Sequence, residues 1–600
     1  MSNFLLQLEA SNVDLIPSSL LMKKRLSSSS TPSHSPVPSP QNLIAVDPRT
    51  SILYVASYPA GQEVEAESPM AENVARVYAY PYAGLCTSPR RPVEIVLPRS
   101  TEKRKFVPRR VVLSPEGDFL AVIGSKKIEV LKLHPILRRL SLWGVSHQKP
   151  SDGGLQQVLP ERDRADSFGV DTITAEPLFI SAPRGATIVD VTWHPLSFTH
   201  LVVLTSDNTV TVYNMLARSD PASQEQSIAL PASRGPAASI AFACDTAAAL
   251  VGKGPRTLEE RFLGWNALTC FVLYEDGRVD ALCPVLPYDV YISKRVKEDI
   301  SGCAEAGEGA GKYGAFVEDA LKRLVDGSEV YDDEFFMFRK DAGNKMEVVP
   351  IEILLPIKNE LINGPPLKAV KLVYCLGSPS VLIRVTSDGA VDVHVLCSDM
   401  CPHWKSSSSV SPPPVPVVPA VRRVVLGSKR SPVGIDPSTH CVVCRRNGAQ
   451  IFVSARCVDG GAGGSDVLFS VDLSGALECL ERRFESEDLA PIKESELDVV
   501  VRRVKLGEEV ERIFGVGFHG SGALLVLTGD GRLKVVSDEK AGMVEMDGKK
   551  ELPVVAEPLR IELNDTTNPA YALLCEKVFG SEYLGKITEI KELLLESEKR

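Results

Sequence analysis

The sequence is poor in aromatic residues and lacks the features of a membrane-spanning or secreted chain. Phe, Trp and Tyr make up only 6% of its 600 residues. No stretch approaches the roughly 18 consecutive apolar residues that a membrane helix needs. The first residues, MSNFLLQLEASNVD, include Glu9 and Asp14 and no basic cluster, so no signal peptide is expected. The formal net charge of −10 argues against wholesale nucleic-acid binding through bulk electrostatics.

The cysteines lack the pattern of a disulfide framework or a zinc site. There are 13, an odd number, scattered along the chain, and we expect reduced, buried thiols in the cytosol or nucleus. Cys441 and Cys444 have zinc-like spacing, but they lie in an apolar, strand-like run where thiols are usually core residues. Cys397, Cys401 and His403 form a second group. We expect no metal.

The motifs of common enzymes are also missing. GEGAGKY at Gly307–Tyr313 superficially resembles a phosphate-binding loop, but Ala306 stands at the first glycine position and Tyr313 replaces the magnesium-binding hydroxyl residue. There is no G-x-S-x-G nucleophile motif. His194 and His394 stand apart in repeated segments and are expected to be packing or surface residues. The sequence therefore predicts neither an enzyme nor a cofactor.

One phrase, T-[SG]-D-[GN] between two short apolar runs, recurs along the chain. It occurs within Leu201–Tyr213, Val381–Val395 and Leu524–Val536, and a looser copy lies in Cys270–Leu282. The flanks alternate with a period of two, which is typical of half-buried strands. Asp-Gly and Asp-Asn suit a two-residue primed turn, because both residues tolerate positive φ. Each copy is predicted to be a β-hairpin.

Seven such strand units predict an all-β fold, a seven-bladed β-propeller with long loop insertions, a helical insertion and a C-terminal helix. The units are Leu43–Val55 with Val74–Tyr80, Arg110–Leu133, Val189–Tyr213, Leu268–Leu282, Leu372–Leu396, Cys441–Val453 with Val467–Leu480, and Phe514–Val536. Ser474-Gly475 takes the turn position in the sixth. Phe4–Leu8 is a lone strand that could complete the last blade. No Trp precedes an Asp, so the propeller is not of the WD type. A two-sheet sandwich array is the competing fold.

Long insertions account for the length beyond the about 40–45 residues of a compact blade. We assign residues 1–566 to the propeller, with insertions at about 23–40, 288–349 and 405–419, and loops at Gln148–Arg164 and Asp220–Pro236. Within Tyr288–Val349 we expect no strand pairs but a helix over residues 314–327, ending at Gly327. Residues 567–600 are assigned to a C-terminal helix, the start of a coiled-coil region.

Two stretches are candidate binding sites. The first is the apolar stripe of the inserted helix, which could dock a partner helix or pack on its own propeller; it comprises Phe316, Val317, Ala320, Leu321, Leu324 and Val325. The second is the basic stretch 90–110, either a patch for RNA or an acidic partner or a solvated loop between blades; it includes Arg90, Arg91, Lys103, Arg104, Lys105, Arg109 and Arg110. Phe106 is its one aromatic residue, so base stacking is poorly supported.

Four phrases in order resemble one family. They are SPEGDFLAVIG at Ser114–Gly124, VTWHPLSFTHLVVLTSDNTVTVYNM at Val191–Met215, GRVDALCPVLP at Gly277–Pro287 and YCLGSPSVLIRVTSDGAVDVHVL at Tyr374–Leu396. Together they resemble the N-terminal propeller of the linker nucleoporin of the cytoplasmic-filament, mRNA-export subcomplex of the nuclear pore, fungal type. The likeness covers about Leu43–Ser537.

The resemblance implies a non-enzymatic scaffold at the cytoplasmic face of the nuclear pore complex. Propellers of this family anchor the C-terminal tail helix of an FG nucleoporin and the autoproteolytic C-terminal domain of a GLFG nucleoporin. A coiled-coil region follows them, as residues 571–599 would here. No small-molecule substrate and no membrane insertion are implied. The alternative from the residues alone is a propeller that binds RNA or an export factor through residues 90–110.

Overall fold

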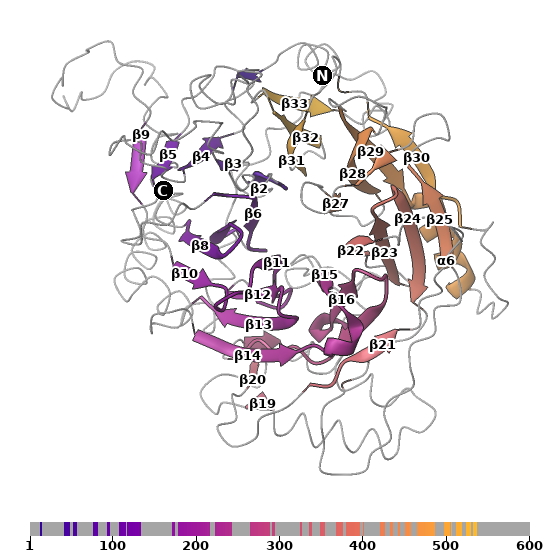
Figure 1. The fold of residues 1–600 in the computed structure, drawn as a ribbon, viewed down its shortest axis with the longest axis horizontal. Coiled ribbons are helices and arrows are strands. Elements are labelled where there is room, and N and C mark those ends of the chain that lie inside the picture. The colour runs from indigo at the N-terminus through magenta and orange to yellow at the C-terminus, as the bar shows by residue number, and fades with distance from the viewer. Residues whose placement is uncertain are drawn as a thin grey trace, which may run out of the picture. The chain divides into compact units, whose positions relative to one another are not determined.

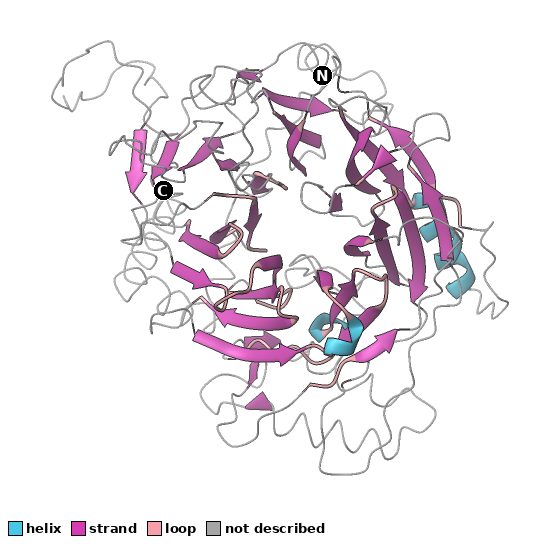
Figure 2. Ribbon diagram, in the orientation of Figure 1, coloured by secondary structure: helices cyan, strands magenta, loops and turns pink. Residues whose placement is uncertain are grey.

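The protein folds as an all-β, seven-bladed β-propeller, as the sequence predicts (Figures 1 and 2). The computed structural model describes residues 13–14, 41–47, 52–56, 76–81, 93–96, 107–115, 117–133, 171–174, 178–197, 199–215, 223–242, 265–288, 291–293, 325–326, 335–338, 348–353, 368–375, 380–396, 400, 402, 421–426, 433–435, 442–444, 450–457, 465–485, 497–504, 506, 512–518, 524–529 and 532–536. The chain divides into two compact units, Met1–Ser181 with Leu506–Asp538, and Ala182–Lys505 with Glu539–Arg600.

Three blades make up the first unit. Blade 1 contains β2 (Ile44–Asp47), β3 (Ile52–Ala56), β4 (Arg76–Pro81), β5 (Val93–Val96) and β9 (Asp171–Thr174), which pairs with β5 in parallel. Blade 2 contains β6 (Arg110–Leu113), β7 (Phe119–Ile123), β8 (Lys127–Lys132) and β10 (Leu178–Ser181). Blade 7 contains β31 (Ile513–Phe518), β32 (Leu524–Thr528), β33 (Arg532–Val536) and β1 (Val13–Asp14).

An N-terminal strand completes blade 7, but it is not the predicted one. Val13 lies opposite Leu533 and Asp14 opposite Arg532, in antiparallel register. Phe4–Leu8, which the sequence suggests for this role, lies outside the described residues. The pairing joins residues about five hundred positions apart and covers an edge that β33 would otherwise expose.

Four blades make up the second unit. Blade 3 contains β11 (Ile188–Trp193), β12 (His200–Thr205), β13 (Thr209–Asn214) and β14 (Ser223–Ala229). Blade 4 contains β15 (Ala237–Phe242), β16 (Cys270–Tyr274), β17 (Val279–Leu282) and β21 (Ile351–Ile353). Blade 5 contains β22 (Ala369–Cys375), β23 (Ser380–Thr386), β24 (Ala390–Leu396) and β25 (Val421–Val425). Blade 6 contains β26 (Val433–Gly434), β27 (Val442–Cys444), β28 (Gln450–Cys457), β29 (Asp466–Asp472) and β30 (Val500–Arg503).

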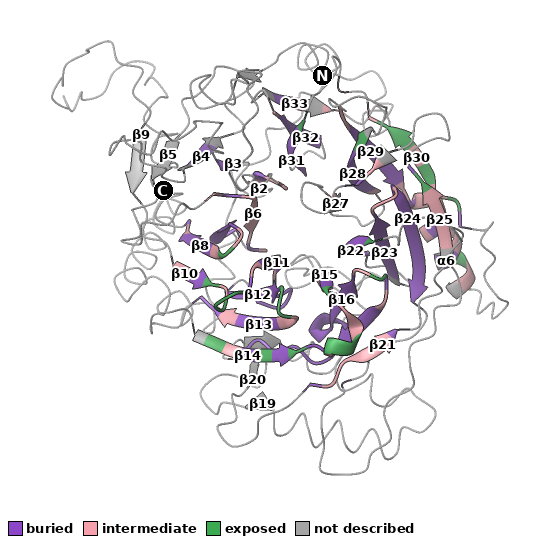
Figure 3. Cartoon of the chain, viewed as in Figure 1, coloured by how far each residue is buried: buried purple, intermediate pink, exposed green. Residues whose placement is uncertain are grey.

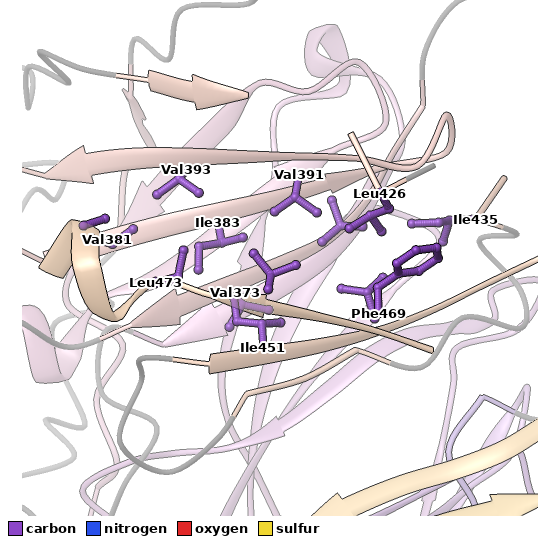
Figure 4. Close-up of a cluster of buried hydrophobic side chains, with 14 of the residues drawn as sticks. Val373, Val381, Ile383, Val391, Val393, Leu426, Ile435, Ile451, Phe469 and Leu473 are labelled. Carbon is purple, nitrogen blue, oxygen red and sulfur yellow. The ribbon is translucent and has the colours of Figure 1, made fainter. Parts of the chain in front are cut away.

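Neighbouring blades within a unit pack through alternate residues of their middle strands, which are buried on both faces (Figure 3). Between blades 5 and 6 the core is almost entirely branched aliphatic: Ile383 and Val393 meet Ile451 and Leu473, with Phe469 at one end (Figure 4). Such side chains fit a pleated surface well, and burying each stabilises the fold by about 1.5–3 kcal/mol. The outermost strands are more exposed, as the burial of β30 shows.

The repeated phrase forms a three-residue turn rather than the predicted two-residue turn. Thr205 pairs with Thr209 across the loop, and the Asn208 N–H donates to Thr205 O over 3.0 Å. Only the last loop residue has positive φ: 58° at Asn208, 88° at Gly277 and 76° at Gly389. This is the common three-residue hairpin loop, a type I turn followed by one residue in the left-handed region. Only that one residue in each loop must therefore tolerate positive φ.

The other residues of the phrase have structural partners too. The Thr205 and Thr386 hydroxyls each donate to the Asp two positions later, over 2.5 Å. The Ser206 N–H donates to Thr187 O, and the Ser206 hydroxyl accepts from the Thr187 N–H over 2.9 Å. In blade 5 the Ser387 carbonyl accepts from the Ile435 N–H of blade 6. The phrase therefore fixes turn geometry and strand register, which accounts for its repetition.

Three other local predictions are wrong. The Asp220–Pro236 loop contains β14, the outermost strand of blade 3. Ser474-Gly475 is not a hairpin turn; it starts α6 (Ser474–Glu485), the only α-helix in the described residues, which buries Ala476 and Leu480 in the core shared with blade 5. The insertion after blade 4 does contain strand pairs, taken up below. Residues 567–600 lie outside the described residues, so the C-terminal helix remains a prediction.

Candidate functional site: the insertion of blade 4

The structure changes the interpretation of the insertion between β17 and β21. Its described part is a three-stranded antiparallel sheet of β18 (Tyr291–Ser293), β20 (Phe335–Phe338) and β19 (Val325–Asp326), with β20 in the middle. Val325 therefore lies in a strand, not at the end of the predicted helix. Phe316, Val317, Ala320, Leu321 and Leu324 lie outside the described residues, so the apolar stripe remains a prediction.

The sheet has an unusually apolar sequence for a segment outside the blades. Its middle strand reads FFMF, and β18 reads YIS. Ile292 pairs with Phe336, and Val325 pairs with Phe338. Because successive residues of a strand alternate between faces, these four positions fall on the same face of the sheet. The helical periodicity of residues 316–325 gave no indication of this sheet.

The chain leaves blade 4 toward the insertion through a buried segment, Cys283–Tyr288, that blade 3 holds. The exit segment makes three hydrogen bonds to side chains of blade 3. His194 Nε2 lies 2.9 Å from Val285 O, and the Leu286 N–H donates to Gln226 Oε1 over 3.1 Å. The Tyr288 N–H donates to Glu225 Oε2 over 3.2 Å. We call His194, His200, Glu225 and Gln226 the exit clamp.

His194 is a packing residue, as the sequence predicts, and it also has a specific partner. Its ring is fully buried and tilted against Phe242, with centroids 4.9 Å apart. The Leu196 N–H donates to Nδ1, so Nε2 carries the proton and donates to Val285 O. Burial lowers the pKa of His194 from 6.5 to about 3, so the ring stays neutral. The VTWHP phrase thus provides a neutral donor for the exit segment.

His200 and Glu225 form a buried hydrogen-bonded pair within the clamp. His200 Nε2 lies 2.9 Å from Glu225 Oε2, and His200 Nδ1 lies 2.6 Å from Ser197 Oγ. Asn214 Nδ2 donates to Glu225 Oε1 over 2.9 Å. A serine, a histidine and a carboxylate in a row resemble a hydrolase triad. Here Ser197 is 2% exposed and His200 is fully buried, so no substrate reaches the hydroxyl, and the arrangement serves packing.

The chain returns from the insertion through β21, which blade 3 also holds. Val348 is buried in the core between blades 3 and 4. Arg234, in the 3-10 helix Ala232–Arg234 that follows β14, places Nη2 2.8 Å from Glu352 Oε2 and 3.5 Å from Asp280 Oδ1. This hydrogen bond from Arg234 lowers the pKa of Glu352, whereas burial raises that of Asp280. Both ends of the insertion are thus tied to the edge of blade 3.

Of the basic residues in the stretch, only Arg109 and Arg110 at its end are described with their side chains. Arg90, Arg91, Lys103, Arg104 and Lys105 lie outside the described residues. Arg109 and Arg110 are half-buried; Arg110 begins β6 opposite Ile123, and the Arg109 carbonyl accepts from the Gln41 N–H. With β5 at Val93–Val96, part of the stretch is blade rather than the solvated loop considered above.

Neither a metal site nor a membrane-spanning helix is found among the described residues. Of the cysteine and histidine groups with ligand-like spacing, Cys444 lies in β27 and the other members lie outside the described residues. Among the described residues, no three His, Cys, Asp or Glu side chains are placed to hold a metal ion. None of the described helices is long and apolar enough to cross a bilayer.

Comparison with known proteins points to nucleoporins. No protein-family model matches the chain. The chain is 24% identical over 262 residues to nuclear pore complex protein NUP88 of Arabidopsis thaliana, across 39% of this chain and 30% of that protein. A chain of the yeast heterotrimeric Nup82-Nup159-Nup116 nucleoporin complex matches with a TM-score of 0.50 and 13% identity, over 83% of this chain and 98% of that one.

A second solved complex gives the same result. A chain of the Chaetomium thermophilum heterotrimeric Nup82 NTD-Nup159 TAIL-Nup145N APD complex matches with a TM-score of 0.52 and 14% identity, over 84% of this chain and 96% of that one. The structural likenesses show a shared propeller fold, and the sequence likeness extends to a nuclear pore protein. The resemblance to a nucleoporin propeller, drawn from the four sequence phrases, is thereby confirmed.

Proposed function

We propose that this chain is a structural scaffold nucleoporin whose propeller anchors other nucleoporins at the nuclear pore complex. The proposal rests on one observation: the chain is similar in sequence to NUP88, and its propeller is similar in fold to chains of two Nup82 complexes. The blades themselves are dense cores joined by satisfied turns, and the Ser-His-Glu arrangement is sealed. A protein built in this way acts through its surface and insertions rather than through chemistry.

The partners that the comparisons suggest are two. The solved complexes contain Nup82 with Nup159 and with Nup116 or Nup145N. By analogy this propeller binds the tail helix of an FG nucleoporin and the autoproteolytic domain of a GLFG nucleoporin, at the cytoplasmic face of the pore, and so supports mRNA export. We place the tail helix on the blade 4 insertion, because its sequence is apolar and long surplus segments in compact folds usually serve binding.

Replacement of Phe316 and Leu324 by Asp in the full chain tests this placement. A Nup159-type tail peptide should bind the double variant at least about tenfold more weakly, because two charges would enter an apolar contact. Glu478→Ala, at an exposed position of α6, is the matched control. Unchanged affinity in a folded double variant would remove the insertion from the binding site. Failure of the wild-type chain to bind the peptide would count against the scaffold function itself.

The alternative function, RNA binding through residues 90–110, has a separate test. Such binding should weaken steeply with salt, because displaced counterions supply much of its free energy. Neutralising Arg90, Arg91 and Lys103 should then abolish it. No observation in the described residues favours this function, since Arg109 and Arg110 take part in blade 2 and its approach.

A further inference from the structure

The exit clamp lies outside the insertion, but its side chains hold the segment of chain that leads into the insertion. The exit segment Cys283–Tyr288 is not a strand, and its residues are buried up to Pro287. Buried backbone groups need hydrogen-bond partners. Two of them, Val285 O and Leu286 N, are satisfied by side chains of blade 3, as is the N–H of the half-buried Tyr288. The path of the exit segment is therefore set by blade 3 and not only by the blade to which it belongs.

Glu225 is the centre of the clamp. Its carboxylate is 3% exposed and contacts three groups: His200, Asn214 and the Tyr288 N–H. A buried carboxylate is costly unless each of its oxygens is paired, and here both are. The rigid β12 and β13 hold His200 and Asn214 as cross-strand partners, so the carboxylate has little freedom to move. It presents a fixed acceptor to the chain at the point where the insertion starts.

The first strand of the inserted sheet follows almost at once. β18 begins at Tyr291, so it starts at most about 11 Å from the Cα of Tyr288. A linker this short limits how far β18 can lie from Tyr288, and β18 pairs with β20. At the return end, the Arg234–Glu352 ion pair constrains β21 from the same side. The chain is therefore anchored to the edge of blade 3 both where it leaves blade 4 and where it returns.

We propose that Glu225, with His200 and Gln226, acts as a positioning device that orients the β18–β20–β19 sheet for partner docking. These are positioning residues: they hold the base of the sheet and need not touch the partner. The inference rests on the proposed function for its consequence in binding, but the clamp itself is a property of the free protein. Its loss should raise the mobility of the sheet first and weaken binding as a result.

Hydrogen exchange on the full chain tests the clamp without a partner. Glu225→Ala removes three hydrogen bonds, and Glu225→Gln keeps the shape while removing the charge. In both, the amides of β18 and β20 should exchange at least about tenfold faster, while those of β23 and β32 stay unchanged. Gln224→Ala, an exposed neighbour on β14, is the control and should change neither set. Unaltered exchange in β18 and β20 would overturn the proposal.

Binding of the tail peptide then distinguishes the clamp proposal from the proposal that the insertion is the docking site. Faster exchange with about threefold to tenfold weaker binding supports both proposals, because ordering a mobile site on association reduces the free energy of binding. Faster exchange with unchanged binding leaves the clamp in place and argues against the insertion as the docking site. If Glu225→Ala does not fold, Glu225→Gln decides the question. Loss of binding by the Phe316→Asp, Leu324→Asp variant with no effect of Glu225→Gln on exchange would refute the clamp alone.

Discussion

Lys371 of β22 and Asp190 of β11 form an ion pair across three consecutive inner strands of the second unit, with Nζ 2.5 Å from Oδ2. Between them lies β15, whose Ser239 hydroxyl and Ile240 N–H donate to the same Asp190 oxygen over 2.7 and 3.0 Å. The Asp190 side chain is 5% exposed and that of Lys371 14%. One carboxylate thus joins blades 3, 4 and 5 at their innermost strands.

This geometry predicts a large effect of Asp190→Ala on stability. Removing the carboxylate takes away the ion-pair partner of a mostly buried ammonium group and the acceptor of three donors, on Ser239, Ile240 and Val191. This should cost about 3–5 kcal/mol in the free energy of unfolding. Chemical denaturation followed by fluorescence would measure it. The matched control is Glu275→Ala, which breaks the exposed pair with Lys368 and should cost about 0–1 kcal/mol. Equal losses in the two variants would contradict the argument.

Asn208 offers a test of the repeated turn. It has a φ of 58°, its Nδ2 donates to Gly235 O over 2.6 Å, and its Oδ1 accepts from the Ala237 N–H over 2.9 Å. Asn208→Gly keeps the backbone but loses both bonds, at a cost of about 1–2 kcal/mol. Asn208→Ala adds the left-handed strain, about 1 kcal/mol more. The thermal denaturation temperature should be highest for the wild type, lower for Asn208→Gly and lowest for Asn208→Ala. Equal stability of the two variants would show that left-handed strain does not contribute.

His394 should make the protein acid-sensitive. It is fully buried in β24, and neither ring nitrogen has a hydrogen-bond partner among the described residues. Burial is the main cause that lowers its pKa well below 6.5, and the positive charge of Arg384 lowers it further. The neutral ring is therefore the form that the folded state accepts. Below about pH 6.5 the unfolded chain takes up a proton that the folded chain does not.

Its contribution to stability is thus complete above that pH and declines as the pH falls, by up to about 1.4 kcal/mol per pH unit. His394→Leu should remove this part of the decline and stabilise the protein at pH 7 by about 1–3 kcal/mol, because two unsatisfied nitrogens leave the core. Denaturation of both proteins between pH 5 and pH 8 would show it. Parallel curves for variant and wild type would mean that His394 does not carry the effect.

Local sequence patterns were sufficient to predict the inner hairpins of the blades. Period-two alternation of branched residues and the recurring turn phrase predicted the hairpins at Leu201–Tyr213 and Val381–Val395, because both features act over a few residues. The turn type was missed, since Asp-Gly satisfies both the two-residue and the three-residue loop. The helix at Ser474 was missed because its turn-like start, Ser-Gly, is equally suited to begin a helix.

The candidate site was only partly accessible from sequence. The boundaries of the insertion followed from the break in the repeat, but its sheet did not, because pairing Ile292 with Phe336 joins residues more than forty positions apart. The clamp could not be foreseen at all. Nothing in the sequence relates Glu225 to Tyr288, and their contact exists only because blade 3 and the exit segment meet in the folded chain.

The sequence by itself therefore determined an all-β chain of seven repeated units, their hairpin turns, and the absence of common catalytic motifs, because propensity, periodicity and turn chemistry are local. Tertiary structure alone decided which strands complete each blade, which buried charges are paired, as Lys371 is with Asp190, and where the insertion is anchored. Those outcomes depend on contacts between residues far apart in the sequence, whose free energy is gained only when the blades pack.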